Sequence, residues 1–205
     1  MTEWSATFFP EEDLKQRLKK AAHVAPSPAQ LKWMRRGYTA FLHYSPNTFT
    51  NRQWGNGTEK PEDFCPDRQD PEQWVRVCKE AGMKMVIPTL KHHDGFCQWR
   101  TESTDFHVGN GPVPQDIAEA MSKACAKNGI EFGVYLSPWD MHEREKGVWP
   151  HDEYQDVYLQ QLSELMTRYG EIGELWLDGA CGERPIWTAV PSYQPEEWYD
   201  VMEKS

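Results

Sequence analysis

The sequence lacks a long hydrophobic run, and no stretch of about 18 apolar residues, the length needed to cross a bilayer, occurs among its 205 residues. Residues 1–20 carry acidic side chains and no apolar core, so they do not have the pattern of a signal peptide. We therefore expect no membrane partner. The cytoplasm is the expected compartment, unless a leader has been removed and the protein is periplasmic or secreted.

Cysteine is scarce and shows no motif. The five cysteines are odd in number and widely spaced, and no CxxC pair occurs. They are Cys65, Cys78, Cys97, Cys125 and Cys181. A disulfide framework or a structural zinc site is therefore not expected, and free thiols in a reducing compartment are the default expectation.

Positive charge is also in short supply. Lys and Arg number 22 against 32 Asp and Glu, which gives a formal net charge of −10. Such a surface repels phosphate backbones, so nucleic acid is not an expected partner, whereas a neutral substrate is compatible with it. Aromatic residues, by contrast, are abundant: ten are Trp. Trp rings can stack on the apolar faces of sugars, although a Trp-rich core would explain the number equally well.

Four short apolar runs rich in β-forming residues alternate with helical patterns. The runs cover residues 38–45, 83–90, 131–138 and 174–179. The first two helical patterns begin after Asp70 and Pro114, the third runs from Tyr154 to Tyr169, and they end at Gly82, Gly129 and Gly170. This βα order predicts parallel strands joined by right-handed crossovers. It indicates an α/β fold of the (β/α)8 TIM-barrel type, with a doubly wound sheet as the alternative.

About four βα units account for the whole length of the chain. Residues 195–204 have the pattern of the helix after the fourth strand, whereas a full barrel needs eight units and typically about 250 residues. We therefore expect residues 1–205 to form one partial catalytic barrel domain.

Polar residues gather where each predicted strand ends, which is the active face of a barrel and favours that fold over the doubly wound sheet. Asp178 ends the fourth strand, and Trp176 stands two positions earlier. Alternation along a strand directs both side chains to the same face, toward the barrel mouth. Asp178 is therefore a candidate nucleophile, although an Asp before Gly179 is also a common turn residue.

The pair His92 and His93 follows the second strand and suggests two kinds of site. Adjacent residues of a strand point to opposite faces, so within a strand this pair is poorly arranged to share one ion. A loop could turn both rings inward, but the spacing matches no standard zinc pattern. A metal-dependent (β/α)-barrel hydrolase using His43, His92 and Asp178 remains an alternative. We favour hydrogen bonding to sugar hydroxyls, because imidazoles, the Tyr135 hydroxyl and tryptophan N–H groups supply the required donors and acceptors.

Four segments carry a resemblance to a known family. They are FLHYSPNTF (41–49), KHHDGF (91–96), FGVYLSPWD (132–140) and ELWLDG (174–179). From Tyr38 onward the chain resembles glycoside hydrolase family 29, the α-L-fucosidases. The longer segment FLHYSPNTFTNRQWGNG and the YLSPWD segment are most similar to the branch specific for α-1,3/1,4-linked fucose.

The resemblance implies a retaining exo-α-L-fucosidase that cleaves terminal fucose from a fucosylated oligosaccharide or glycan without a metal or an organic cofactor. Asp178 matches the position of the nucleophile. The positions that match fucose-binding and pocket-lining residues are His43, Trp54, His92, His93, Tyr135 and Trp176.

The second carboxyl group of the mechanism, the acid/base, comes in the family from a strand later than the fourth, so we expect it to be missing from this chain. Glu183, Asp140 and Glu143 are weaker candidates for it. The rival interpretation is a truncated, non-catalytic fragment that binds fucosides. Half a barrel also leaves two open sheet edges, which makes a homo-oligomer an open alternative.

Overall fold

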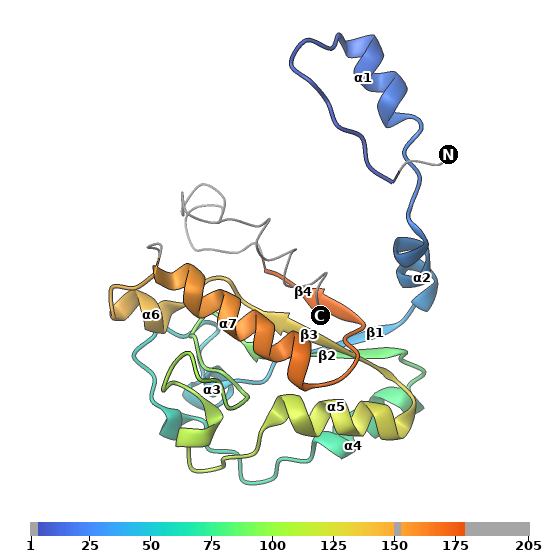
Figure 1. The fold of residues 1–205 in the computed structure, drawn as a ribbon. Helices are drawn as coiled ribbons and strands as arrows, with labels where there is room; N and C mark the ends of the chain where they lie inside the picture. Colours follow the sequence, from blue (N-terminus) through green and yellow to red (C-terminus); the bar gives the residue numbers. More distant parts are fainter. Residues whose placement is uncertain (1–3, 150–152, 179–205) are drawn as a thin grey trace. The chain divides into compact units, whose positions relative to one another are not determined.

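The computed structural model describes residues 4–149 and 153–178 (Figure 1). The described residues form two compact units, divided between Gly37 and Tyr38.

The first unit contains two helices that periodicity did not predict, α1 (Leu14–Ala21) and α2 (Pro28–Arg36). Each begins with a capping box. In α1 the Gln16 backbone N–H donates to the Asp13 carboxylate at 2.7 Å, and the Gln16 side chain accepts from the Asp13 backbone N–H at 2.9 Å. Ser27 caps α2 in the same way. Neither helix contains a buried residue, so local capping, and not core packing, defines where they begin.

The second unit is built on a parallel sheet in the order β1-β2-β3-β4, which confirms the predicted α/β topology. The strands are shorter than the apolar runs that predicted them. Their bounds are β1 Thr39–Leu42, β2 Met85–Lys91, β3 Glu131–Leu136 and β4 Glu174–Trp176. The register pairs Tyr135 of β3 with Trp176 of β4, and it shifts irregularly in β2 between Thr89 and Lys91.

Three predicted helices are present: α4 (Pro71–Glu80), α5 (Ile117–Asn128) and α7 (Glu153–Arg168). Asp70 and Asp116 cap the first two. Short helical turns that the sequence did not predict occupy the loops after the strands. They are α3 (Pro46–Thr50), η1 (Pro61–Asp63), η2 (Val108–Asn110) and α6 (Met141–Glu145).

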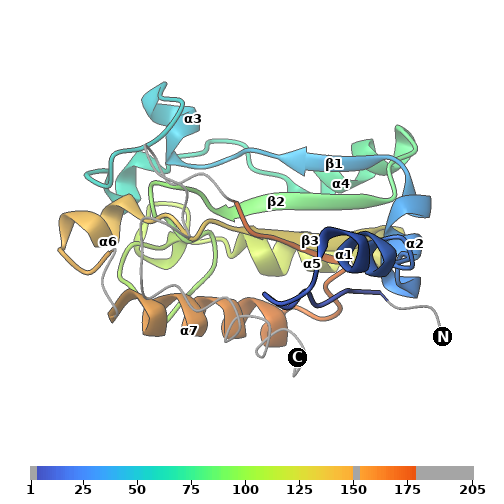
Figure 2. The ribbon, with the colours of Figure 1, turned by 90° about the horizontal axis from the view of Figure 1, so that it is seen from above.

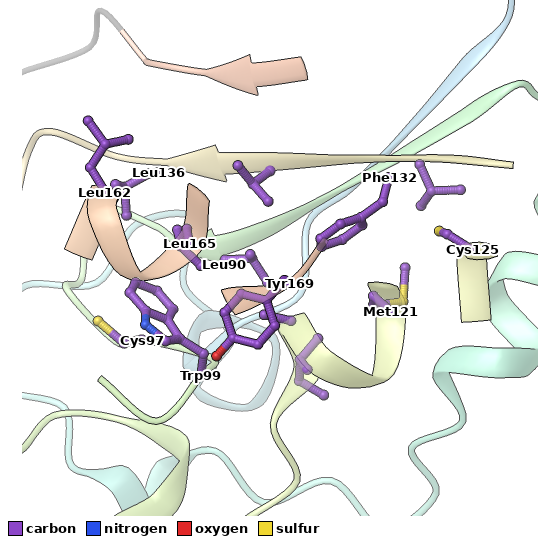
Figure 3. Close-up of a cluster of buried hydrophobic side chains, with 14 of the residues drawn as sticks. Leu90, Cys97, Trp99, Met121, Cys125, Phe132, Leu136, Leu162, Leu165 and Tyr169 are labelled. Atoms are coloured by element: carbon purple, nitrogen blue, oxygen red, sulfur yellow. The ribbon is translucent and has the colours of Figure 1, made fainter. Parts of the chain in front are cut away.

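Helices α4, α5 and α7 cover one face of the sheet (Figure 2). The core between them is continuous (Figure 3), and its members include Leu90, Trp99, Met121, Phe132, Leu136, Leu162 and Leu165. A separate cluster of Phe41, Met85, Ile87 and Tyr135 packs elsewhere on the strands. The alternation along β3 sends Phe132, Val134 and Leu136 into the helix-covered core and Tyr135 to the opposite face. That opposite face supplies the floor of the site.

Four cysteines, Cys65, Cys78, Cys97 and Cys125, are free thiols, and Cys181 lies outside the described residues. No helix in residues 4–149 and 153–178 combines the length and apolar character that a bilayer crossing requires.

Candidate active site

The carboxyl ends of β3 and β4 bring Asp178 and Tyr135 together. Asp178 lies two residues beyond β4, and its carboxylate Oδ2 accepts a hydrogen bond of 2.7 Å from the Tyr135 hydroxyl. The Tyr135 side chain is buried, whereas the Asp178 side chain is 28% exposed, so the carboxylate can be reached from solvent. Trp176 contacts Phe41 at 4.9 Å between ring centroids. Phe41 belongs to the Tyr135 cluster, so Trp176 and Asp178 share the inner face as predicted.

Three imidazoles face this carboxylate. The ring centroids of His43 and His92 are 5.4 Å apart, and those of His92 and His93 are 4.2 Å apart. The Nε2 atom of His93 lies 3.8 Å from Asp178 Oδ2. Opposite faces were expected for His92 and His93 within a strand, but the structure has the alternative, in which a loop brings both rings together. Strand β2 ends at Lys91, and the chain then turns, so both rings lie side by side and not across a pleat.

Burial determines the charge of these rings. Desolvation, followed by the neighbouring imidazoles His93 and His43, lowers the pKa of His92 to about 3. Desolvation also lowers the pKa of His93 to about 4, against the opposing attraction of Asp178. The pKa of His43 is lowered for the same first reason. Near pH 7 the site therefore presents neutral imidazoles, which can donate or accept hydrogen bonds but contribute no positive charge.

Two tryptophans form an aromatic wall beside His93. Trp54 is half-exposed and meets His93 edge-on at 5.6 Å and Trp139 at 5.7 Å between ring centroids. Trp139 is buried, and its ring lies 4.8 Å from that of His93. Trp54 was predicted from the sequence, but Trp139 was missed. Its position in the SPWD segment directly after β3 is the signal that could have found it.

The loop that presents Trp54 is held by a buried carboxylate. Glu59 accepts hydrogen bonds from the Arg52 guanidinium at 2.8 Å and from the Gly57 backbone N–H at 2.9 Å. A Cβ atom at Gly55 would collide with the Asp94 side chain, so the loop after β1 packs directly onto the loop after β2. The half-exposed Trp54 is therefore attached to a rigid support.

Asp94 is a buried carboxyl group beneath this contact. It accepts hydrogen bonds from the Phe96 backbone N–H at 2.7 Å and from Asn47 Nδ2 at 2.8 Å. Desolvation raises the pKa of Asp94 to about 7, and the nearby carboxylates of Glu59 and Asp140 add to the rise. Asp94 thus joins the loops after β1 and β2 and lies behind the surface that a ligand would touch.

Two of the three acid/base candidates, Asp140 and Glu143, have structural roles. Asp140 is buried, forms an ion pair of 3.3 Å with the buried Lys91, and caps α6 through the Glu143 backbone N–H at 2.9 Å. The Glu143 carboxylate is buried against Lys146 and the Thr104 hydroxyl. Both side chains serve packing and capping, so they are not suited to proton transfer to a substrate. Glu183 and the predicted helix over residues 195–204 lie outside the described residues.

Within the described ranges, no group of three or more His, Cys, Asp or Glu side chains is arranged to hold a metal ion, and this includes the alternative set His43, His92 and Asp178. The geometry instead presents one carboxylate, three neutral imidazoles and a phenol close together, with the exposed indole rings of Trp54 and Trp176 beside them. This combination can bind hydroxyl groups and attack an electrophilic carbon.

A family model described as Alpha-L-fucosidase matches residues 4–205. Alpha-L-fucosidase 1 of Arabidopsis thaliana is 46% identical over 165 residues, which are 77% of this chain and 31% of that protein. A crystal structure of a Bacteroides ovatus protein superimposes with a TM-score of 0.83 at 42% identity, covering 96% of this chain and 34% of that one. A family 29 fucosidase from Ruminococcus gnavus in complex with fucose gives 0.75 at 33% identity, over 87% of this chain and 40% of that one.

The chain thus spans about a third of the length of the curated relatives it matches. Its four parallel strands match part of the TIM-barrel domain of the related structures, as predicted from the sequence. The chain belongs to the α-L-fucosidase family, glycoside hydrolase family 29.

Proposed function

We propose that this chain supplies the fucose pocket and the nucleophile of a retaining exo-α-L-fucosidase, which removes terminal α-linked L-fucose from oligosaccharides or glycoconjugates. One observation carries the proposal: the accessible Asp178 carboxylate accepts the Tyr135 hydroxyl at 2.7 Å where three imidazoles converge. A relative solved with bound fucose gives the substrate class.

The proposed reaction begins with attack by an Asp178 carboxylate oxygen on the anomeric carbon. The glycosidic bond breaks, the leaving oxygen takes a proton from an acid, and a fucosyl ester forms on Asp178. Water then attacks the same carbon and gives up a proton to the base, while the bond between that carbon and the Asp178 oxygen breaks; this restores the carboxylate and releases fucose with its original configuration. Tyr135 supports the first step because a hydrogen bond to a carboxylate favours its charged, nucleophilic form.

Recognition is proposed to rest on His43, His92 and His93, whose neutral rings can pair with hydroxyl groups as donors or acceptors. Trp54 and Trp176 are 48% and 44% exposed, so their rings are available for contact with the apolar side of a sugar.

The acid/base is proposed to come from sequence beyond the described residues, in keeping with the chain's span of about a third of its relatives. We further propose that the chain prefers α-1,3/1,4-linked fucose, acts in the cytoplasm, and self-associates through the sheet edges at β1 and β4.

α-L-Fucosyl fluoride tests the proposal without the missing acid, because fluoride leaves without a proton. We expect fluoride release by the chain, abolished in Asp178→Gly. Azide should restore it in that variant and yield β-fucosyl azide, since azide would occupy the space of the deleted carboxylate. Fluoride release that persists in Asp178→Gly without azide would contradict the assignment of the nucleophile.

A non-catalytic fucoside-binding chain is the second candidate, favoured by the two sheet edges that the described strands leave at β1 and β4. It predicts measurable fucose binding, weakened by His92→Ala, with no fluoride release above the spontaneous rate.

A further inference from the structure

Ser137 lies directly beyond β3 and is fully buried next to the site. Its hydroxyl oxygen is 2.7 Å from His93 Nδ1, 2.9 Å from the Trp139 carbonyl oxygen and 3.1 Å from the Trp139 backbone nitrogen. A serine hydroxyl has one proton to donate and two lone pairs that accept. Three partners therefore use its whole capacity, and only certain assignments of the protons are consistent.

The assignment follows from the two backbone groups. The Trp139 N–H can only donate, so it occupies one lone pair of the Ser137 oxygen. The Trp139 carbonyl can only accept, so it takes the Ser137 proton. The remaining lone pair faces His93 Nδ1, which must then carry a proton itself. The Tyr135 hydroxyl gives its own proton to Asp178, so toward Ser137 it can act only as an acceptor, and a Ser137 proton directed there would likewise leave His93 Nδ1 as the donor.

The opposite assignment, with Ser137 donating to His93, removes the donor that the structure gives to the Trp139 carbonyl. Buried carbonyl groups are rarely left without a donor. The Nδ1–H tautomer of His93 is therefore the one that this geometry favours, and in a neutral imidazole it leaves Nε2 with a lone pair.

We propose that Ser137 is a positioning residue that holds His93 in the Nδ1–H tautomer, so that its Nε2 lone pair faces Asp178 and accepts a hydrogen bond from a sugar hydroxyl. The role of the sugar hydroxyl rests on the proposed function. The 3.8 Å between His93 Nε2 and Asp178 Oδ2 is too long for a direct hydrogen bond, and in this tautomer both atoms are acceptors. A ligand that brings a hydroxyl proton satisfies His93 Nε2, since Asp178 Oδ2 already accepts from Tyr135.

The alternative tautomer would have a different effect on binding. With its proton on Nε2, His93 could rotate to donate to the Asp178 carboxylate and close the space between them. Ser137 prevents this arrangement by fixing the ring from the other side. It touches no substrate itself and acts through His93.

The tautomer can be measured without any sugar. Long-range ¹H–¹⁵N spectra of the ¹⁵N-histidine-labelled 205-residue chain distinguish protonated from unprotonated ring nitrogens, and His93→Gln identifies the resonances. The spectra are taken at pH 7, since the pKa of His93 is lowered to about 4 by desolvation. We expect a protonated Nδ1 and an unprotonated Nε2, a shift toward Nε2–H in Ser137→Ala, and the original pattern in Ser137→Thr.

Ser122→Ala is the matched control. Its hydroxyl also donates to a backbone carbonyl, that of Tyr169, but it lies in α5 and meets no imidazole. Ser137→Ala loses three buried hydrogen bonds and Ser122→Ala loses one, so Ser137→Ala should lower the thermal stability more, but only Ser137→Ala should alter the His93 tautomer. It should also weaken fucose binding about tenfold in calorimetry, the factor for one hydrogen bond, while Ser122→Ala changes it less than about twofold.

A protonated Nε2 in the unchanged chain, or an unaltered tautomer in Ser137→Ala, would overturn the inference. If the tautomer responds as expected but the unchanged chain does not bind fucose, the positioning role of Ser137 is supported. The hydrogen bond from a sugar hydroxyl to His93 then fails together with the proposed function.

Discussion

The hydrogen bond from Tyr135 to Asp178 can be removed by deleting a single oxygen atom. Tyr135→Phe removes the hydroxyl that donates to Asp178 Oδ2 at 2.7 Å and leaves the ring. The ring packs against Phe41 at 5.5 Å and His92 at 5.9 Å between centroids, and these contacts should survive. The substitution therefore tests the hydrogen bond with little change in packing.

A hydrogen bond to a charged group contributes about 1.5–3 kcal/mol. Since one pH unit corresponds to about 1.4 kcal/mol, losing a bond to the ionised carboxylate should move the acid limb of the pH profile up by about 1 to 2 units. The sign follows because the bond is made to the charged form, so its removal favours the protonated one. Fluoride release from α-L-fucosyl fluoride should fall more at pH 5 than at pH 8.

Tyr158→Phe is the matched control. Tyr158 is equally buried, and its hydroxyl donates to the Leu136 carbonyl at 3.0 Å, not to Asp178. It should lower the free energy of unfolding by about 1 kcal/mol without moving the pH profile. If Tyr135→Phe leaves the acid limb unchanged, or if both variants shift it equally, the assignment of Tyr135 to the nucleophile is wrong.

Three further predictions concern the support beneath the site. Lys91→Met should lower the free energy of unfolding in urea by about 3–5 kcal/mol, because it leaves a buried carboxylate unpaired. Lys123→Met, at an exposed ion pair, should change that free energy by no more than about 0.5 kcal/mol, and equal effects of the two variants would contradict the buried ion pair. Gly95→Ala should lower the free energy of unfolding by about 1–3 kcal/mol more than Gly147→Ala does. Both glycines have a positive φ, but of the two only Gly95 lacks room for a Cβ atom, so equal losses would show that its loop has space. Burial raises the pKa of Asp94 from 3.8 to about 7, so the folded chain keeps a proton that the unfolded chain loses, and this group's stabilising contribution declines from about pH 4 to 7. Asp94→Asn should therefore gain stability relative to the unchanged chain across that window, on the order of a few kcal/mol in thermal or urea unfolding, and a constant difference would contradict the raised pKa.

The sheet and its covering helices could be predicted because their signals are local. The apolar runs indicated where β2 and β3 lie, and Asp70 with Pro71 marked where α4 begins. The helices of the first unit were missed because they have few apolar residues, such as Leu14 and Leu18 of α1, and the structure leaves these exposed. Their capping boxes, with Gln three residues after Asp13 and after Ser27, were a usable signal.

The site was only partly predictable. Alternation still describes Trp176 and Asp178, although β4 ends at Trp176, because no turn follows directly; after β2 the chain turns at once, so alternation does not apply to His92 and His93. The roles of Ser137 and Trp139 depend on contacts with His93, which is 44 residues from Ser137 in the sequence, and no local pattern contains such contacts.

Covalent trapping would identify the nucleophile itself. The chain is incubated with 2-deoxy-2-fluoro-α-L-fucosyl fluoride, and its intact mass and peptides are measured. We predict one fluorofucosyl adduct, located on the peptide that contains Asp178 and absent in Asp178→Asn. An adduct on another carboxylate, or no adduct from a folded sample that binds fucose, would contradict the role of Asp178 as the nucleophile.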